Sequence, residues 1–320
     1  MNSIGGYFEL EINDLGSLYH DNAIALNSGR NGFEHILNSK QYLHVFIPYY
    51  TCEVILDSLI KNKISYTYYH INKNFLPIIS QFKDNSALLY TNYFGLMHNN
   101  VLELSKKYSN LIVDNAQAFY DNPIKGISSF YSPRKFFGLP DGGFVYFADE
   151  ASISNYSVDT SFDKFDHLLS SVEFGTESGY DKFKKNEEYL KGHPIKIMSK
   201  LTNKLMRGID YENIREKRMM NFNYLHNKLK SKNHLTSLID NAKIIGPMVY
   251  PFLHEGNEQL RKKLISQKIF IAQYWPNVLS LVNKDSFEYD LTQNLIHLPI
   301  DQRVEKIDIQ KIAQTVINSL

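Results

Sequence analysis

The stretch that decides the fold runs from Leu111 to Phe147 and reads LIVDNAQAFYDNPIKGISSFYSPRKFFGLPDGGFVYF. It begins with three apolar residues that run directly into Asp114, a pattern that predicts a buried strand ending in a carboxylate. Lys135 follows 21 positions later in a turn-rich segment, and a second strand-like run begins at Phe144. We therefore expect an acid at the end of one strand and a lysine in the turn before the next.

An acid at a strand end and a lysine flanked by hydroxyl groups and glycines match what pyridoxal phosphate (PLP) requires of a protein. The lysine forms a Schiff base with the coenzyme aldehyde, and the acid pairs with the pyridinium nitrogen, so that the ring remains an electron sink. Taken alone, Asp114 could equally be a helix cap or turn residue, and Lys135 a solvated surface charge. The PLP interpretation therefore depends on the rest of the chain.

Length and composition place the chain among globular proteins. Its 320 residues are 43% hydrophobic, which is enough for a substantial core in one large domain or in a large and a small one. The 35 basic and 34 acidic residues nearly balance without a long basic run, so neither nucleic acid nor an anionic membrane is an expected partner. The single cysteine, Cys52, excludes a disulfide framework and a cysteine-cluster metal site.

The remaining composition predicts an ordinary cytoplasmic protein. The N-terminus lacks the basic and apolar regions of a signal peptide, and no apolar stretch approaches membrane-spanning length. The histidines are scattered without a pair spaced to share a metal, so no metal ion is expected. We therefore expect a soluble protein without a membrane partner.

Strand-like and helix-like segments alternate along the first half of the chain. Strands are expected at 23–27, 44–48, 65–70, 87–90 and 111–113, with a short edge strand or arm at 4–12 and helices near 33–37, 53–60 and 100–108. This alternation predicts an α/β fold with a mostly parallel sheet. In such sheets functional residues gather past the carboxyl ends of strands, where the segments SGRN, PYYTC, TNYFG, DNAQ and SPRK all lie.

The turn Ser28-Gly29-Arg30-Asn31-Gly32 opens the first of these helices. Free backbone N–H groups at a helix N-terminus, together with the helix dipole, favour the binding of an anion. The turn is therefore a candidate phosphate cradle, although an ordinary capped helix start would have the same sequence.

The second half of the chain changes in composition. Residues 151–233 are rich in Ser, Asp, Lys and Glu, and the run from Tyr211 to Leu229 predicts one long amphipathic helix. This helix is expected to pack within its own chain rather than to form a coiled coil between subunits. A second α/β unit is expected from residue 244, with strands at 269–274 and 295–299 and helices at 257–267 and 303–320.

The order of these motifs resembles that of the DegT/DnrJ/EryC1/StrS family, the PLP-dependent sugar aminotransferases of the aspartate-aminotransferase fold. The resemblance covers nearly the whole chain, and the acid–glutamine and lysine–glycine pairs are its more specific parts. The segments that carry it are SGR at 28–30, IPYYT at 47–51, NYFG at 92–95, VDNAQA at 113–118, SFY at 129–131 followed by Lys135, DGG at 141–143 and LIHLPI at 295–300.

The resemblance implies a fold and a set of roles. The fold would be that of the type I PLP-dependent transferases, with a mostly parallel seven-stranded sheet. A large PLP-binding domain would span residues 1–235 and a small C-terminal α/β domain residues 236–320. Lys135 would hold PLP covalently and transfer protons, Asp114 would pair with the ring nitrogen, and Gln117 would face the 3-hydroxyl region.

The phosphate site implied by the resemblance departs from the family pattern. The phosphate would be bound by a serine hydroxyl and by the amides of Gly29, Arg30 and Asn31. The family serine lies five residues before the lysine, where this chain has Phe130. Ser129 and Ser132 are therefore the two candidates for this role.

Two further positions differ from the family. Arg30 stands where the family has a threonine, and its long side chain could reach the phosphate directly or fill substrate space. Cys52 stands where an aromatic residue often covers the coenzyme ring, just after the Pro-x-x-Thr motif. Both changes alter the surface that a substrate would contact.

The function implied by the resemblance is transamination. The substrates would be small molecules, namely a keto sugar linked to a nucleotide and an amino acid donor such as glutamate, and the product would serve surface polysaccharide biosynthesis. A homodimer is also implied, because active sites of this fold lie between subunits.

Three alternatives remain open from the sequence. One is a PLP enzyme of another reaction type; Lys135 argues against the family's dehydratases, which carry a histidine there, but elimination and racemisation use the same lysine chemistry. A second is a protein of this fold that binds cofactor or a partner without transaminase activity. The third, a nicotinamide oxidoreductase, lacks the expected G-x-G-x-x-G after the first strand.

Overall fold

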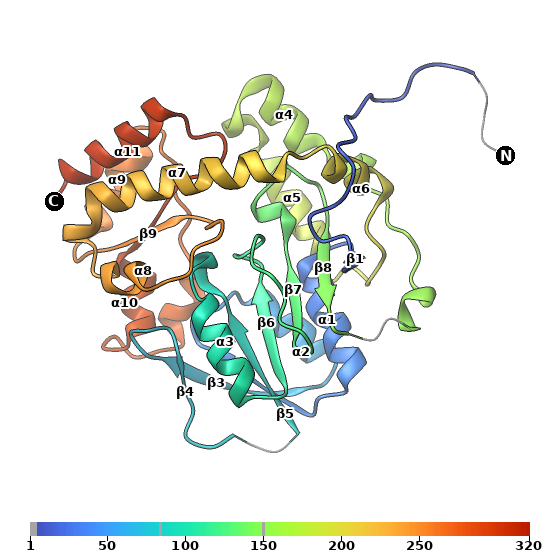
Figure 1. Cartoon of the computed structure of the whole chain (residues 1–320), viewed down its shortest axis with the longest axis horizontal. Coiled ribbons are helices and arrows are strands. Elements are labelled where there is room, and N and C mark those ends of the chain that lie inside the picture. Colours follow the sequence, from blue (N-terminus) through green and yellow to red (C-terminus); the bar gives the residue numbers. More distant parts are fainter. Residues whose placement is uncertain (1–4, 83–84, 149–150) are drawn as a thin grey trace.

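An eight-stranded sheet forms the centre of the molecule (Figure 1). The computed structural model describes residues 5–82, 85–148 and 151–320. Across the sheet, neighbouring strands follow in the order β1 (Ile24–Leu26), β8 (Gly143–Tyr146), β7 (Ser128–Tyr131), β6 (Leu111–Asn115), β5 (Ser86–Thr91), β2 (His44–Pro48), β3 (Ser65–Ile71) and β4 (Pro77–Ile78).

The middle of the sheet is parallel. Strands β3, β2, β5, β6 and β7 run in one direction, whereas β8 is antiparallel to both of its neighbours, β7 and β1. Every residue of β5 and β6 is buried, which is why these strands appear in the sequence as largely apolar runs without alternation. The expected α/β fold with a mostly parallel sheet is confirmed.

The sheet has eight strands rather than the seven that the resemblance implies, and some of them differ from the expected strands. Strands β7 and β4 were not predicted, because β7 contains two serines and β4 has only two residues. Residues 5–12, by contrast, belong to no strand, and residue 4 of that expected segment lies outside the described residues. The segment is an exposed arm, and ion pairs of Glu9 with Lys204 and of Asp14 with Arg207 attach it to the body of the protein.

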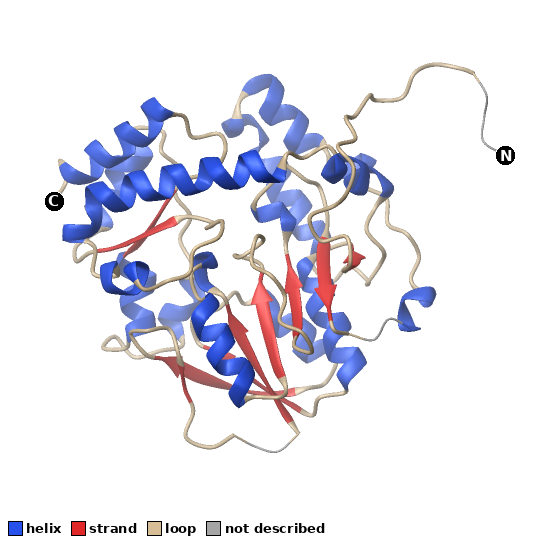
Figure 2. Ribbon diagram, viewed as in Figure 1, coloured by secondary structure: helices blue, strands red, loops and turns tan. Residues whose placement is uncertain are grey.

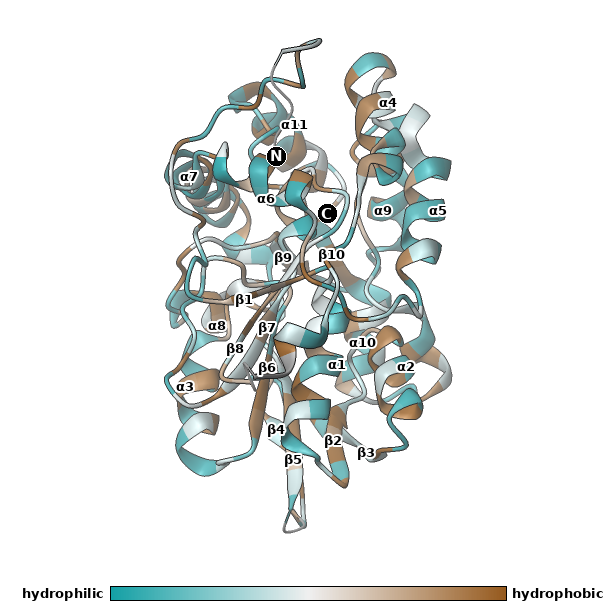
Figure 3. Ribbon diagram, turned by 90° about the vertical axis from the view of Figure 1, so that its right-hand side faces the viewer, coloured by the Kyte–Doolittle hydropathy of each residue, from teal (hydrophilic) through white to brown (hydrophobic). Residues whose placement is uncertain are grey.

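Helices cover both faces of the sheet (Figures 1 and 2). On one face lie α1 (Gly29–Lys40) and α2 (Val54–Lys61), where Phe33, Leu59 and Ile112 belong to one apolar core. On the other face lies α3 (His98–Lys107), where Val101 and Val113 belong to a second core that extends into the C-terminal part of the chain. Figure 3 shows much of the apolar brown on the central strands, as a three-layer α/β arrangement requires.

The C-terminal half adds helices and a small second sheet. In that sheet β9 (Tyr250–Leu253) pairs antiparallel with β10 (Leu295–Leu298). The remaining helices are α4 (Asp166–Phe174), α5 (Tyr180–Leu190), α6 (Lys200–Arg207), α7 (Tyr211–Leu229), α8 (Thr236–Asp240), α9 (Glu258–Ser266), α10 (Phe287–Asn294) and α11 (Lys306–Ile317).

Helix α7 has the bounds that the sequence predicts and crosses the molecule beside α11 (Figure 1). Phe222 and Leu225 of α7 are buried in the core that also contains residues of β9 and α11. On the same helix, Asn221 donates hydrogen bonds to the carbonyls of Ile300 at 3.3 Å and Val304 at 3.0 Å. Helix α7 therefore fastens the C-terminal segments to the rest of the chain.

The strand predicted at 269–274 is wrong. These residues form a loop that leads into the 3-10 helix Pro276–Ser280. Ile269 is buried and Phe270 exposed, so the alternation that suggested a strand is present, but no strand among the described residues pairs with it. The carbonyl of Ala272 instead accepts a hydrogen bond from Nδ1 of His297 at 3.0 Å. The other predicted strands and helices occur, with ends that shift by a few residues.

Replacement of Gly143 by alanine should destabilise the protein. A Cβ atom at this position would lie 2.3 Å from the carbonyl carbon of Ser28 and 2.5 Å from the nitrogen of Gly29, both of which are backbone atoms. We expect Gly143→Ala to lower the free energy of unfolding by at least about 1–3 kcal/mol, as measured by urea denaturation.

Gly138→Ala is the matched control for this measurement. Its Cβ atom would meet the Leu168 side chain at 3.5 Å, an ordinary contact distance, so its unfolding midpoint should stay close to that of the wild type. Equal midpoints for the two variants would contradict the expectation.

Candidate active site

Several strands end at one edge of the sheet, and the predicted site residues lie there. Strands β1, β2, β5, β6 and β7 all present their carboxyl ends to this edge. Ser28 follows β1, Cys52 lies just past β2, Asp114 is near the end of β6, and Ser132 follows β7. The parallel sheet therefore gathers side chains that are far apart in the sequence.

Asp114 is held inside the edge of the sheet, with 9% of its surface exposed. Its Oδ1 accepts a hydrogen bond from the backbone N–H of Ala116 at 2.8 Å, which fixes the carboxylate in the turn after the strand. Burial raises the pKa of Asp114, and the positive charge of Lys135 opposes this shift. The acid and the lysine that the sequence singles out therefore lie within electrostatic reach of each other.

Lys135 ends a short 3-10 helix, Pro133–Lys135, that directly follows β7. Its backbone N–H donates to the carbonyl of Ser132 at 3.3 Å, and the N–H of Phe136 donates to that of Pro133 at 2.9 Å. Phe136 and Phe137 are buried, whereas Lys135 is exposed. The tight turn therefore presents the lysine to solvent while two aromatic side chains anchor the main chain.

The turn before α1 is a helix N-terminus that is already partly capped. Ser28 is the N-cap residue, and its Oγ accepts a hydrogen bond from the N–H of Asn31 at 3.1 Å. The amide of Asn31 is therefore occupied, and Ser28 also forms a parallel β-bridge with Gly142, whose N–H donates to the carbonyl of Asn27 at 2.8 Å. A Cβ atom on Gly29 would lie 3.2 Å from the Cβ of Ser132, so glycine lets the turn touch the segment after β7.

Arg30 borders the site, but its guanidinium also reaches toward α5. Its Nη1 donates to the carbonyl of Leu190 at 2.7 Å. Its Nε is buried without a hydrogen-bond partner in the part of the chain that the structure describes. The charge of Arg30 lowers the pKa of Cys52, which places the guanidinium within electrostatic reach of the other site residues.

The two candidate serines lie in different surroundings. Phe130 packs in the core beneath α1, so the adjacent Ser129 points to the opposite face of the sheet, where it is buried. Ser132 instead borders Gly29 at the start of α1. Of the two serines, Ser132 is the one in contact with the helix N-terminus.

Gln117 lies in the turn after β6 with one end of its carboxamide fixed. Its Oε1 accepts a hydrogen bond from the N–H of Phe94 at 2.8 Å. Its Nε2 is buried and has no hydrogen-bond partner among the described residues. A buried donor without a partner costs about 1–3 kcal/mol, so this group is available to a bound molecule.

Cys52 lies within reach of the same charges. Burial raises the pKa of its thiol, the charges of Lys135 and Arg30 lower it, and that of Asp114 raises it again. Burial also raises the pKa of Tyr274 to about 12, and the Cys52 thiol contributes to that rise. Tyr274, which the sequence did not single out, therefore borders the site from the C-terminal part of the chain.

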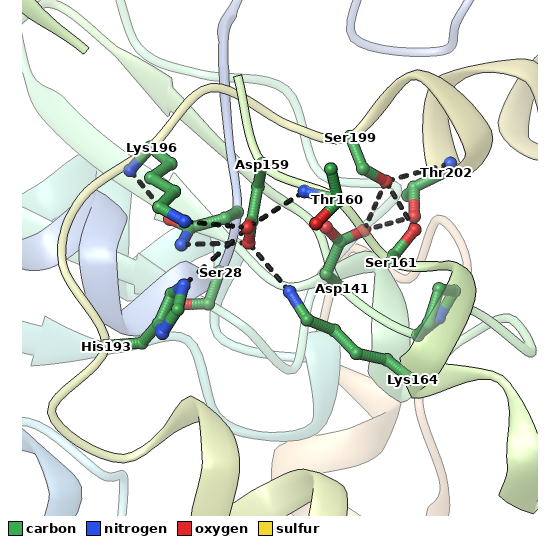
Figure 4. Close-up of polar contacts among 12 residues, drawn as sticks. Ser28, Asp141, Asp159, Thr160, Ser161, Lys164, His193, Lys196, Ser199 and Thr202 are labelled. Carbon is green, nitrogen blue, oxygen red and sulfur yellow. Dashed lines mark hydrogen bonds and ion pairs between the residues drawn. The ribbon is translucent and has the colours of Figure 1, made fainter. Parts of the chain in front are cut away.

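A second charged cluster flanks the start of α1 and was not predicted (Figure 4). The carboxylate of Asp159 accepts hydrogen bonds from the Nζ atoms of Lys164 at 2.8 Å and Lys196 at 3.2 Å, and Nε2 of His193 lies 3.6 Å away. Burial would raise the pKa of Asp159, but hydrogen bonds from Lys164 and from the backbone N–H of Thr160 lower it to about 2. The buried acid is thus ionised and neutralises part of the surrounding positive charge.

The aspartate of the Asp-Gly-Gly segment has a structural role (Figure 4). Asp141 is fully buried, and its Oδ1 accepts hydrogen bonds from the hydroxyls of Thr202 and, at 3.2 Å, of Ser199. Burial raises the pKa of Asp141, whereas the hydrogen bond from Thr202 lowers it. Gly142 has a φ of +119° and Gly143 carries no side chain, so the chain can enter β8 against the start of α1.

Local motifs could not reveal the Asp159 cluster. Its acid and its lysines belong to a segment rich in charges, where a single charged residue carries no positional signal. Lys196 does lie between two isoleucines, and Ile197 forms β-bridges with Leu26 and Val158. That short alternation was the available hint that the segment passes beside β1.

Comparison with solved structures identifies proteins of the same fold. Sugar aminotransferase CalS13 from Micromonospora echinospora aligns over 94% of this chain and 88% of its own, with a TM-score of 0.66 and 12% identity. A DegT DnrJ EryC1 StrS aminotransferase from Brucella abortus aligns over 93% and 85%, with a TM-score of 0.62 and 14% identity. S. venezuelae DesV, in complex with a ketimine intermediate, aligns over 93% and 84%, with a TM-score of 0.65 and 14% identity.

At these identities the similarity concerns the fold. The chain has the type I fold of the PLP-dependent aminotransferases, and the resemblance to the DegT/DnrJ/EryC1/StrS proteins is confirmed at that level. No protein-family model matches the sequence, and no curated protein matches it either.

Replacement of Asp159 by asparagine should reduce stability in a pH-dependent manner. The folded-state pKa of about 2 lies below the ordinary value of 3.8, so the ionised acid stabilises the fold above pH 3.8 and this stabilisation is lost as the pH falls through 2. At neutral pH we expect Asp159→Asn to lower the free energy of unfolding by about 3 kcal/mol, because Lys164 would remain buried without its counter-charge. Urea denaturation at several pH values measures the difference, which should shrink as the pH falls from 3.8 toward 2.

Asp181→Asn serves as the control. Asp181 is exposed and lies 3.9 Å from Lys184, so its loss should leave the unfolding midpoint nearly unchanged at every pH. A difference between wild type and Asp159→Asn that stays constant across the pH range would contradict the assigned pKa.

Proposed function

We propose that this protein is a PLP-dependent aminotransferase that acts on a keto sugar. The observation that carries the proposal is the juxtaposition of Lys135 and Asp114, whose charges interact at the carboxyl edge of the sheet next to the start of α1. The fold shared with sugar aminotransferases such as CalS13 supports it.

The residues at this edge fit PLP. The buried Nε2 of Gln117, which lacks a partner among the described residues, would donate a hydrogen bond near the coenzyme 3-hydroxyl. The start of α1 would offer N–H groups and a helix dipole to the phosphate. Gly29 has no side chain there, which lets Ser132 lie close to the start of the helix.

Asp114 would hold a proton on the ring nitrogen of the coenzyme. When bound, PLP supplies an electron sink for the reacting carbon. Burial alone raises the pKa of Asp114 and favours its neutral form, but the charge of Lys135 opposes this effect, and a cationic ring N–H would oppose it further. The ionised carboxylate is therefore the form suited to pair with a protonated heterocycle.

Lys135 would have two tasks in the reaction. Its Nζ would bind the coenzyme aldehyde and, once released, would carry a proton to and from the reacting carbon. The main chain at Lys135 is held by the tight turn and by the buried rings of Phe136 and Phe137. The backbone would thus remain fixed while the side chain moves between these tasks.

Ser132 is our candidate for the phosphate, with the amides of Gly29 and Arg30. Ser129 points to the other face of the sheet, and the amide of Asn31 is already bonded to the Ser28 hydroxyl. The Nε of Arg30, which has no hydrogen-bond partner within the described part of the chain, would add a charged donor at the same place.

The substrates are proposed from the resemblance. We propose a nucleotide-linked keto sugar as amino acceptor, an amino acid such as glutamate as donor, and a role in surface polysaccharide biosynthesis. Cys52 replaces a larger aromatic residue beside the ring, and Tyr274 borders the thiol, so these two side chains would shape the space around the substrate.

We also propose a homodimer and a division of the chain at residue 235 into a large and a small domain. Helix α7, in the proposed large domain, packs on β9 and α11 of the proposed small domain.

Within the described residues, no helix combines the length and the hydrophobicity needed to cross a bilayer. The cytoplasmic location stays a prediction from the sequence.

Removal of the Lys135 amine should abolish covalent binding of PLP. Wild-type protein mixed with PLP should show a shifted coenzyme absorbance and, after borohydride reduction, a mass increase on the peptide that contains Lys135. Lys135→Ala should show neither, and amino transfer from glutamate should fall by about a thousandfold or more. Lys125→Ala, in the exposed loop between β6 and β7, should behave as the wild type does.

Two results would decide against the proposal. Detection of covalently bound PLP on Lys135→Ala would show that Lys135 does not form the Schiff base. A wild-type protein that leaves the PLP spectrum unchanged would favour a protein of this fold without transaminase activity.

Ser132→Ala and Ser129→Ala form a matched pair that tests the phosphate site. Because a hydrogen bond to a charged group contributes about 1.5–3 kcal/mol, Ser132→Ala should weaken PLP binding by roughly tenfold to a hundredfold. Ser129→Ala should leave the PLP dissociation constant, measured by fluorescence titration of the apoprotein, near the wild-type value. The reverse order of effects would assign the phosphate to Ser129.

A further inference from the structure

Arg218, on α7, is one of the largest fully buried side chains of the molecule, with 1% of its surface exposed. Among the described residues its guanidinium donates four hydrogen bonds, all to uncharged oxygen atoms, and its Nε has no partner. Burial lowers the pKa of Arg218 to about 10, although the charge of Asp301 offsets part of this shift. An apolar side chain could fill the same space without the cost of burying a charge. The role of Arg218 therefore lies in the groups that accept its hydrogen bonds.

The guanidinium of Arg218 joins three segments of the chain. Nη1 donates to the carbonyls of Pro247 at 3.3 Å and Met248 at 3.1 Å. Nη2 donates to the carbonyl of Phe136 at 3.3 Å and to Oε1 of Gln302 at 3.1 Å. The planar fork also lies over the Phe136 ring, 4.7 Å from its centroid. A lysine could not reproduce this arrangement, because it lacks the fork of donors.

Gln302 completes the contact with the segment that carries Lys135. Its Nε2 donates to the carbonyl of Phe136 at 2.8 Å, so this one carbonyl receives hydrogen bonds from both Gln302 and Arg218. Phe136 directly follows Lys135, and its N–H is bonded to the carbonyl of Pro133. Both backbone polar groups of the residue after the lysine are therefore hydrogen-bonded.

A chain of hydrogen bonds connects Nη1 of Arg218 to the side chain of Gln117. The carbonyl of Met248 accepts a hydrogen bond from Nη1 of Arg218. The backbone N–H of Met248 donates to the carbonyl of Phe94 at 2.9 Å. The N–H of Phe94 in turn donates to Oε1 of Gln117 at 2.8 Å, which leaves the Nε2 of Gln117 pointing to no partner among the described residues. One buried cation is thus connected to two residues of the proposed coenzyme site.

We propose that Arg218 and Gln302 are positioning residues that fix the Lys135 turn, and through Phe94 the Gln117 carboxamide, in the arrangement that binds PLP. The inference rests on the proposed function. It assigns to the C-terminal segments around Met248 and Gln302 a direct part in forming the site. Neither residue touches the reacting atoms.

Gln302→Glu separates this role from general packing. A glutamate keeps an oxygen that accepts from Arg218 and adds a charge partner for it, but it cannot donate to the carbonyl of Phe136. We expect the apoprotein to keep its melting temperature, while its dissociation constant for PLP rises about tenfold and a smaller fraction of Lys135 is trapped by borohydride at fixed PLP concentration. Arg218→Lys should weaken PLP binding as well, whereas Arg215→Met, which removes an exposed ion pair with Glu212 on the same helix, should not.

Two outcomes would overturn the inference. One is a PLP dissociation constant and trapped fraction of Gln302→Glu equal to those of the wild type. The other is a loss of PLP affinity matched by an equal loss of apoprotein stability, since that would mark a packing role alone. A wild-type protein that fails to bind PLP would instead overturn the proposed function, so the two failures are distinguishable.

Discussion

One close backbone contact determines where a site can form in this molecule. The first residue of β8, Gly143, lies so near the backbone of Ser28 and Gly29 that any side chain would collide with them. The turn with Lys135 precedes β8, so the contact of Gly143 with Ser28 and Gly29 places this turn beside the start of α1. Strand β6 runs parallel to β7 and ends at the same edge, so it brings Asp114 to that place. A helix N-terminus, a lysine and a buried acid meet as a result.

The sequence predicted the strand ends and turns at which the candidate site residues lie. The apolar run before Asp114, the hydroxyl and glycine residues around Lys135 and the polar turn before α1 each determine a strand end or a turn, and parallel strands place such ends together. The choice between Ser129 and Ser132 was beyond local reasoning. Adjacent strand residues face opposite sides of a sheet, so it depends on the register of β7, a strand without an apolar pattern.

The features that the sequence did not reveal arise from contacts between distant segments. Arg218 is one of several charged residues on a helix whose pattern predicts only amphipathicity, and its burial follows from the way α7 packs against the C-terminal segments. Tyr274 belongs to a loop whose alternation suggested a strand, because alternating burial does not reveal whether a second backbone lies alongside to pair with it. In both cases tertiary packing, rather than local propensity, decided the outcome.

The balance of charge around Asp159 has a kinetic consequence. Its single carboxylate faces two ammonium groups, those of Lys164 and Lys196, and burial lowers the pKa of His193, so that ring stays neutral at physiological pH. The partly exposed ammonium group of Lys196, whose backbone N–H donates to Oδ1 of Asn27 at 3.2 Å, therefore adds positive charge beside the start of α1. An anion that diffuses toward this edge is therefore attracted before it makes any contact, and its rate of capture should fall as added salt screens the field.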